Sequence, residues 1–279
     1  MILIYIVVFI FGCLMGSFLN CVVYRMENKK SFLRGRSFCP KCKHTLAWHD
    51  LIPIFSFLSL KGRCRYCKEK IAIQYLLVEM ATGALLILNF KFLIFNQFFI
   101  FNFEFLIITA YLILINSLLV VIFIYDLKHY IIPDNIVFSA IAVAFLGDLF
   151  GFFNFRHLDF FKNFDFGFRI FENFKMPLIA AISAGGFFFL MWLISRGEWL
   201  GFGDVKLALF MGLFLGWPNV LTALFFAFIS GSVIGLFLIV AQKKKMKSQV
   251  PFGPFLIAGT FFALFWGEKI INWYLGLIT

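Results

Sequence analysis

Four cysteines form two closely spaced pairs in the first quarter of the sequence. The pairs are Cys39-Pro-Lys-Cys42 and Cys64-Arg-Tyr-Cys67, with 21 residues between them. Two such pairs can bring four thiolates to one metal ion in a tetrahedral arrangement, and this spacing is typical of structural zinc. A closed site of four cysteines leaves no open coordination position. We therefore expect the metal to stabilise the surrounding loop rather than to take part in a reaction.

The same residues permit other interpretations. The four thiols could be without a metal, or His44 or His49 could replace one cysteine as a ligand. Two disulfides are disfavoured if segment 24–72 faces the reducing cytosol. Five neighbouring basic residues would favour the thiolate form that a metal requires: Lys41, Lys43, Arg63, Arg65 and Lys68. Cys13 and Cys21 lie in an apolar stretch, and we assign them no function.

Two aspartates lie where apolar stretches meet polar sequence. Asp126 ends one stretch and Asp204 begins another. Ionisable groups at a membrane are costly and often functional. Two carboxyls that meet can share one proton, so that one acts as a general base on water and the other as an acid toward a substrate carbonyl. Gly201 and Gly203 would let a substrate backbone approach Asp204 closely. From spacing alone, both aspartates could equally be ordinary loop or helix-capping residues.

Two further charged residues stand near these aspartates. Asp134 follows Pro133 at an expected helix start, where we predict a capping carboxylate. Lys206 comes two residues after Asp204, so it does not share the same helical face. A contact of Lys206 with lipid headgroups and a position close to the two aspartates both stay open.

The elements that must position these residues are strongly apolar. Hydrophobic residues make up 62% of the 279 residues and charged residues 14%, with a mean hydropathy of +0.95. Soluble domains are about half apolar and a quarter charged, so a soluble core of this length could not bury so much apolar surface. Apolar windows of about 20 residues can cross a bilayer, and such spans are helical because their backbone polar groups must pair internally. We predict an all-α integral membrane protein.

The apolar windows predict about eight transmembrane helices. The N-terminal stretch lacks the basic start of a cleaved signal peptide, so we interpret it as an uncleaved first span. The largest polar piece, segment 24–72, is the predicted cytosolic zinc-binding loop. The predicted spans are 1–23, 74–95, 104–125, 131–150, 177–195, 204–217, 218–241 and 253–277.

Positive charge sets the predicted orientation. Segment 24–72 contains twelve basic and three acidic residues, and segment 242–249 contains four lysines and no acid. The positive-inside rule makes both segments cytoplasmic and places both termini and segment 151–176 outside. The net charge of +11 needs no nucleic-acid partner, because the basic residues cluster between apolar spans.

The motifs around these residues resemble those of the bacterial prepilin peptidases, also called type IV leader peptidases, over nearly the whole chain. The Gly-x-Gly-Asp motif alone is shared with presenilin-like proteases, whereas the ordered set with the cysteine loop is specific. The matching segments are GSFLN at 16–20 with Tyr24-Arg25, both cysteine pairs, DLIP at 50–53, GRC at 62–64, Glu79 in YLLVEMATG, Asp126 with IPD at 132–134, GFGDVK at 201–206 and PFGP at 251–254.

This resemblance implies an eight-helix membrane aspartyl protease with Asp126 and Asp204 as its catalytic residues. It implies a structural zinc ion bound by Cys39, Cys42, Cys64 and Cys67. Such enzymes remove the short basic leader from pilin and pseudopilin precursors, after a glycine and on the cytosolic side. Many members then methylate the new N-terminal residue with S-adenosylmethionine as methyl donor.

The resemblance also implies which segment carries each activity and in which membrane the protein lies. Segment 1–95, with the cysteine loop, is expected to be the methyltransferase part, and segment 104–277 the six-span aspartyl peptidase part. The residues that bind S-adenosylmethionine are unknown, with Glu79 as a candidate; the residues alone do not predict methylation. We expect a multi-pass protein of the cytoplasmic (inner) membrane with its active site facing the cytosol. The expected partners are prepilin and pseudopilin precursors and the lipid bilayer, and the sequence gives no oligomeric state.

Three alternatives compete with this interpretation. The first is a peptidase without methylation, because Cys21, Gln74 and Leu76 depart from the family pattern in the N-terminal part. The second is a transporter or channel with a zinc-ribbon docking loop. Transporters usually place polar residues near the bilayer midplane, whereas the mid-span positions here are almost all apolar. The third is a scaffold whose zinc module binds a partner, which leaves the paired aspartates unexplained.

Overall fold

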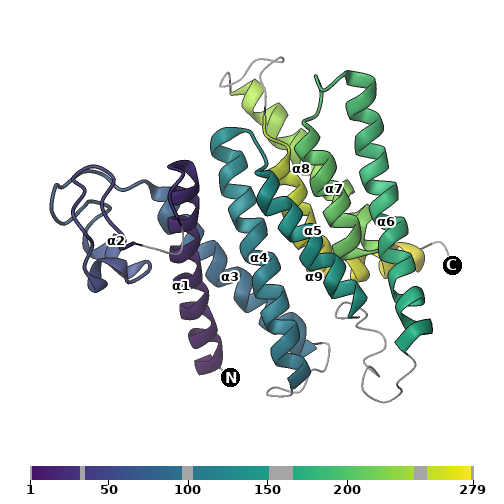
Figure 1. The fold of residues 1–279 in the computed structure, drawn as a ribbon, viewed down its shortest axis with the longest axis horizontal. Coiled ribbons are helices and arrows are strands. Elements are labelled where there is room, and N and C mark those ends of the chain that lie inside the picture. Colours follow the sequence, from purple (N-terminus) through teal and green to yellow (C-terminus); the bar gives the residue numbers. More distant parts are fainter. Residues whose placement is uncertain (1, 32–34, 96–102, 151–165, 242–249, 278–279) are drawn as a thin grey trace. The chain divides into compact units, whose positions relative to one another are not determined.

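The computed structural model describes residues 2–31, 35–95, 103–150, 166–241 and 250–277, and this part of the chain is helical with no β-strand (Figure 1). Its long helices match the predicted spans one for one, which confirms the all-α prediction. Two short helices, η1 (Trp48–Leu51) and α2 (Phe55–Ser59), lie in the cysteine loop. The long helices are α1 (Ile2–Glu27), α3 (Ile73–Phe95), α4 (Phe103–His129), α5 (Asp134–Leu149), α6 (Phe166–Ser195), α7 (Phe202–Leu215), α8 (Asn219–Val240) and α9 (Gly253–Leu275).

Six of these helices are long and apolar enough to cross a membrane, counted over the described residues: α1, α3, α4, α6, α8 and α9. The other two, α5 and α7, have 16 and 14 residues. At about 1.5 Å per residue they are shorter than the ~30 Å hydrocarbon core of a bilayer. The chain is therefore a multi-pass membrane protein, and the count of eight spans stays a prediction. The predicted charged segment 242–249 and most of the predicted outer loop 151–176 lie outside the described residues.

The chain forms two compact units, Met1–Val121 and Ile122–Thr279, with the boundary inside α4. In the first unit, α1 packs on α3 through small residues. Gly12 and Gly16, four positions apart in α1, face Gly83 and Thr82 of α3. A Cβ atom at Gly12 would lie 2.7 Å from the Cα of Gly83, so the close approach of the two backbones requires glycine. In lipid, van der Waals contact between such small residues is a main source of helix association.

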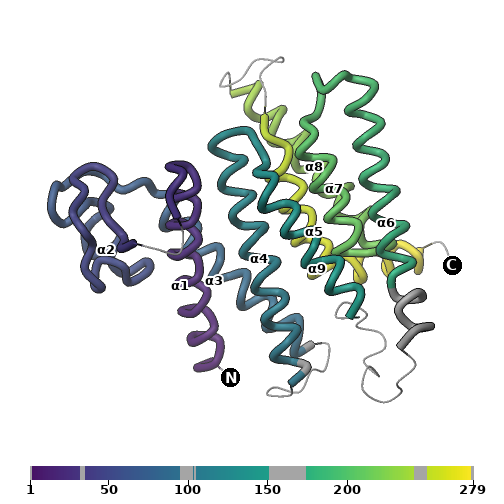
Figure 2. Tube along the Cα trace, in the orientation of Figure 1, coloured from purple at the N-terminus to yellow at the C-terminus, as the bar shows by residue number. Residues whose placement is uncertain are grey.

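In the second unit, α7 lies among the other helices. It packs against α5, α6, α8 and α9, and the Cα trace in Figure 2 shows these helices gathered around it. Every residue from Phe210 to Leu215 is buried. A helix that is mostly enclosed by protein can be apolar on every face and need not match the thickness of the bilayer. The short length of α7 is compatible with this central position.

The contact between α6 and α7 can be tested with two glycine substitutions. A Cβ at Gly212 would meet the backbone of Ala180 and Ala181, whereas a Cβ at Gly235 of α8 would meet nothing within 4 Å. We expect Gly212→Leu to lower the midpoint of thermal unfolding in detergent, or to prevent accumulation of folded protein, because overpacking costs about 1–3 kcal/mol or more. The matched variant Gly235→Leu should leave the midpoint unchanged. Equal effects of the two substitutions would contradict this packing.

Candidate active site and metal centre

The two predicted catalytic aspartates lie at helix ends in the second unit. Asp126 is in the last turn of α4, and Asp204 is in the first turn of α7. Both are buried, with exposed fractions of 4% and 8%. The two carboxyls lie near enough for the charge of Asp126 to act on Asp204. That they come into contact stays a prediction.

Asp204 is held by the start of its own helix. The backbone N–H of Gly201, the N-cap residue of α7, donates a hydrogen bond of 3.2 Å to Oδ2 of Asp204. The carboxylate also sits in the first turn, where the partial positive charge of the helix favours an anion. The capping and catalytic interpretations of Asp204 are therefore compatible: the bond that caps the helix also fixes the position of the carboxyl.

Asp126 is held by a different element. The backbone N–H of Gly253, the first residue of α9, donates a hydrogen bond to its carboxylate. A Cβ at Gly253 would lie 2.5 Å from Oδ2 of Asp126, so a larger residue here would displace the carboxylate. Sequence reasoning did not identify Gly253 as a site residue. The available signal was a glycine flanked by Phe252 and Pro254 at the start of a span.

The connection between α4 and α5 lies against both motifs. Ile132 is buried, and its Cβ would be 2.9 Å from a Cβ placed at Gly203. Its Cδ1 would be 3.2 Å from a Cβ placed at Gly253. Ile132 therefore packs against the glycine next to Asp204 and against the glycine that binds Asp126. This contact was not predicted from the sequence, where Ile132 stands out only as part of the IPD segment.

Asp134 and Lys206 form an ion pair between α5 and α7. Nζ of Lys206 lies 2.6 Å from Oδ1 of Asp134, and it also lies over the rings of Phe138 and Phe202, at 5.0 and 5.1 Å. The predicted capping role of Asp134 is wrong, because Pro133 occupies the N-cap position and no side chain caps α5. The open question about Lys206 is also answered, since it pairs with the first turn of α5.

The two cysteine pairs lie in turns with the same hydrogen-bond pattern. In each turn, the carbonyl of the first cysteine accepts from the N–H of the lysine four residues later, which has a positive φ. The N–H of that cysteine donates to the carbonyl five residues later. The bonds are Lys43 N to Cys39 O, Cys39 N to His44 O, Lys68 N to Cys64 O and Cys64 N to Glu69 O. The two pairs are therefore structurally equivalent.

The four sulfur atoms form a compact cluster that fits one metal ion. All four lie within 4.8 Å of one another, and Sγ of Cys39 is 3.9 Å from Sγ of Cys67. A tetrahedral zinc site with bonds of about 2.3 Å places its sulfur atoms ~3.8 Å apart. Backbone N–H groups of Cys67 and Tyr66 donate to the Cys64 sulfur, and they lower the pKa of this thiol to about 7. Among the described residues the cluster contains no histidine: His44 lies against Tyr66, and His49 is 3.7 Å from Asp50.

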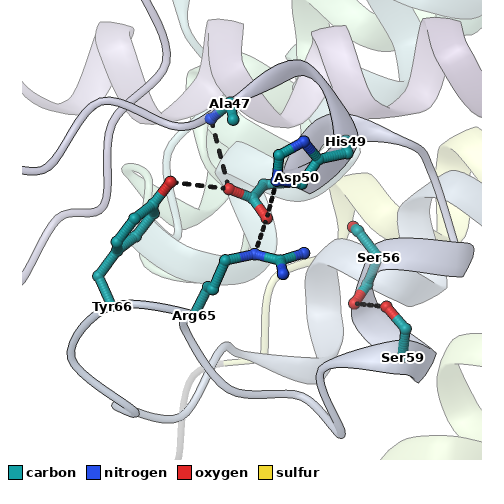
Figure 3. Close-up of polar contacts among 7 residues, drawn as sticks. All are labelled: Ala47, His49, Asp50, Ser56, Ser59, Arg65 and Tyr66. Atoms are coloured by element: carbon teal, nitrogen blue, oxygen red, sulfur yellow. Dashed lines mark hydrogen bonds and ion pairs between the residues drawn. The ribbon is translucent and has the colours of Figure 1, made fainter.

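Asp50 connects the two halves of the cysteine loop (Figure 3). Its buried carboxylate accepts hydrogen bonds from Nε of Arg65 at 2.7 Å, the N–H of Ala47 at 3.3 Å and the hydroxyl of Tyr66 at 3.4 Å. Burial opposes ionisation of Asp50, but the bonds from Arg65 and Ala47 outweigh it and hold the pKa below its usual value. Because Arg65 and Tyr66 lie inside the second cysteine pair, this contact joins that pair to the turn at 47–50.

Glu79, the candidate cofactor-binding residue, is buried in α3. Its Oε2 accepts a hydrogen bond of 2.8 Å from the backbone N–H of Ile54, and the Ser17 side chain also hydrogen bonds to it. Ile54 has a φ of 62°, which is rare for a β-branched residue. Glu79 thus holds an unusual turn of the cysteine loop, and its role in cofactor binding stays a prediction.

Two protein-family models match the chain. Residues 10–92 match the bacterial peptidase A24 N-terminal domain, and residues 112–236 match the type IV leader peptidase family. Three similar proteins are each named prepilin leader peptidase/N-methyltransferase. The protein from Legionella pneumophila is 28% identical over 98% of this chain and 94% of its own length. That from Bacillus subtilis (strain 168) is 28% identical over 96% and 97%. That from Myxococcus xanthus (strain DK1622) is 34% identical over 84% and 62%.

No solved structure matches the chain. The first matched segment contains both cysteine pairs, and the second contains Asp126 and Asp204. A transporter and a scaffold are therefore not favoured. The chain belongs to the type IV leader peptidase family.

Proposed function

We propose that the chain is a membrane aspartyl endopeptidase that removes the leader of type IV prepilins and pseudopilins after a glycine, and that it then methylates the new N-terminal residue. The observation that carries the peptidase proposal is that two buried carboxyls, Asp126 and Asp204, lie in one unit and within electrostatic range of each other. Family membership and the names of the relatives support both activities. The concentration of basic residues in segments 24–72 and 242–249 supports an active site on the cytosolic side of the inner membrane.

Two carboxyls that approach each other closely cannot both ionise easily, so in the proposed mechanism they share one proton. The ionised carboxyl accepts a proton from a water molecule as that water attacks the carbonyl carbon of the scissile peptide. The protonated carboxyl donates to the carbonyl oxygen, and a proton then passes to the leaving amine as the C–N bond breaks. Asp126 and Asp204 are the proposed catalytic pair. The N–H groups of Gly253 and Gly201 orient them, which reduces the reorganisation needed during the reaction.

The four cysteines are the proposed ligands of a structural zinc ion. Their sulfur separations fit a tetrahedral site, and four cysteine ligands leave no position for a substrate. The ion would fix the two equivalent turns to each other and so order the loop between α1 and α3. We assign methylation to segment 1–95, with S-adenosylmethionine supplying the methyl group when bound, and cleavage to segment 104–277.

Substitution of either aspartate tests the peptidase proposal. We expect Asp126→Asn and Asp204→Asn each to lower the rate of leader cleavage by about 10²–10⁴-fold, the usual contribution of a general acid or base. Purified enzyme in detergent and a prepilin would be used, with cleavage followed by gel shift and enzyme level by immunoblot. Methylation of a pilin that has already been cleaved should persist. Asp148→Asn is the matched control, because Asp148 is also a buried aspartate but lies at the C-terminal end of α5, the end remote from Asp134. Normal cleavage by either active-site variant would remove that residue from the mechanism.

Substitution of a ligand cysteine tests the metal proposal. Purified protein should contain about one zinc ion per chain, as expected for a site of four cysteines. Cys39→Ser or Cys64→Ser should lower the zinc content and make the loop sensitive to added protease, whereas Cys21→Ser should do neither. Methylation should suffer at least as much as cleavage, because the aspartates lie in the other unit. Metal-free protein with an equally resistant loop would contradict the assignment.

The ion pair between Asp134 and Lys206 is a proposed positioning contact for Asp204. Lys206 lies in the same helical turn as Asp204, and Asp134 follows the connection that contains Ile132. We expect Asp134→Asn and Lys206→Met to lower kcat about tenfold, a difference of ~1.4 kcal/mol, with little change in KM. The unfolding midpoint should change little, because an ion pair with one exposed partner contributes ~1 kcal/mol or less.

The charge-reversed double variant Asp134→Lys with Lys206→Asp separates positioning from stability. It should recover part of the lost kcat, since the ion pair can form in the opposite sense. If the ion pair had a purely structural role, the single variants would lower the unfolding midpoint in proportion to activity. The double variant would then not recover kcat.

A further inference from the structure

The loop between α1 and α3 contains a segment unlike the rest of it. Segment 51–60, with the sequence LIPIFSFLSL, has no charged residue, and its polar side chains are those of Ser56 and Ser59. The remainder of the loop is strongly basic. Apolar stretches of about 10–14 residues are too short to span a bilayer and are typical of buried, interfacial or re-entrant segments.

The large side chains of this segment are not buried in the protein. Phe55 is 65% exposed and Leu58 is 62% exposed, and Leu51 and Ile52 are also exposed. Trp48, just before the segment, is 78% exposed. These five side chains form what we call the exposed apolar face. Exposing so many apolar side chains to water costs free energy. Such a face therefore indicates contact with a protein partner or with a membrane.

The exposed apolar face continues the exposed apolar surface of α1. Phe9, Ile10 and Leu14 of α1 line a common apolar groove of about 470 Å³ with Trp48 and residues 51–54 of the loop. Ile10 and Leu14 are themselves exposed, in a helix that is apolar enough to cross the membrane. They lie 11 to 15 residues before Arg25, which is ~16–23 Å along the helix axis. The start of the segment therefore lies beside an exposed part of a helix that can cross the membrane.

A place in lipid requires backbone polar groups to pair within the protein, and several donors of the segment do so. Within α2 and its ends, the N–H groups of Ser56, Leu58 and Leu60 donate to carbonyl groups four residues earlier. The N–H of Ile54 comes before the first turn of α2 and points away from it. Glu79 accepts that donor, at 2.8 Å.

Both ends of the segment return to polar surroundings. Before it, Asp50 pairs with Arg65 at 2.7 Å, so the carboxylate and guanidinium neutralise each other. After it come Lys61 and Arg63, both exposed. Charged residues at both ends and apolar residues between them are expected of a hairpin that enters the membrane from one side and leaves on the same side.

We propose that segment 51–60 is a re-entrant membrane segment whose exposed apolar face contacts lipid acyl chains, and that Glu79 anchors its turn. The metal-binding loop is then attached to the bilayer between its two cysteine pairs rather than free in the cytosol. This proposal needs only that α1 crosses the membrane, and it does not depend on the peptidase mechanism.

Photo-crosslinking in a bilayer tests the lipid contact. Benzophenone-bearing residues would replace Phe55 or Leu58 in the full chain, reconstituted into vesicles of phosphatidylethanolamine and phosphatidylglycerol. Val233, an exposed residue of α8, is the lipid-facing control, and Lys41, whose side chain is 70% exposed in the first cysteine pair, is the aqueous control. We expect lipid adducts at Phe55 and Leu58 at the yield of Val233, several-fold above that of Lys41. Yields equal to that of Lys41 would overturn the proposal.

Two additions to this experiment test the alternatives. If adding a prepilin replaced the lipid adducts with adducts to the peptide, the face would be a substrate surface, and the lipid assignment would be wrong. For the anchor, Glu79→Gln keeps a carbonyl acceptor for Ile54, whereas Glu79→Leu removes it. We expect the lipid adduct at Phe55 to persist with Gln and to be lost with Leu, while zinc content stays unchanged in both. A persistent adduct with Leu would show that Glu79 is not the anchor.

Discussion

A carboxyl buried among membrane helices needs a hydrogen-bond donor from the protein, because water is scarce there and an unpaired charge is very costly. Asp204, Asp126 and Glu79 meet this need in the same way, each with a backbone N–H as donor. The donors are Gly201, Gly253 and Ile54, and each lies at the start of a helix. Backbone donors at helix starts are otherwise unpaired, so each of these contacts satisfies two groups at once. Asp148 is an exception within the described residues, because its Oδ2 has no hydrogen-bond partner.

This requirement explains much of the geometry around the two aspartates. The N–H of Gly253 can reach Asp126 only if α9 begins beside the end of α4, and a side chain at position 253 would prevent it. Ile132 fills the space between the two glycines that flank the site, so the α4–α5 connection fixes where α5 begins. The start of α5 then carries Asp134 to Lys206 in the first turn of α7. Residues without a direct part in catalysis thus restrict the positions of the two carboxyls.

The sequence was sufficient for the features that depend on local spacing. Apolar windows predicted the long helices, and the two Cys-x-x-Cys pairs predicted a cluster of four sulfur atoms. The contacts of Gly253, Ile132 and Lys206 join segments far apart in the chain, and no periodicity reveals such neighbours. The capping prediction for Asp134 failed by one position, because Pro133 occupies the N-cap and Asp134 is already inside the helix. The predicted span 204–217 already had the 14 residues of α7, whereas α5 is shorter than the predicted span 131–150 because residues 131–133 are not helical.

Segment 24–72 contains a feature that a count of its charged residues does not detect. Twelve basic residues mark the whole loop as cytoplasmic, and this count is insensitive to ten apolar residues in its middle. Two contacts hold the first part of those ten residues: Asp50 with Arg65 just before the segment, and Ile54 with Glu79 within it. The first contact involves a residue between two proposed metal ligands, and the second involves a residue of α3. A metal ion that orders Cys64 and Cys67 would also fix Arg65, and so would favour the position of the apolar segment beside α1. The metal centre would then contribute to the placement of the loop at the membrane through the contact of Arg65 with Asp50, in addition to the contact of Ile54 with Glu79.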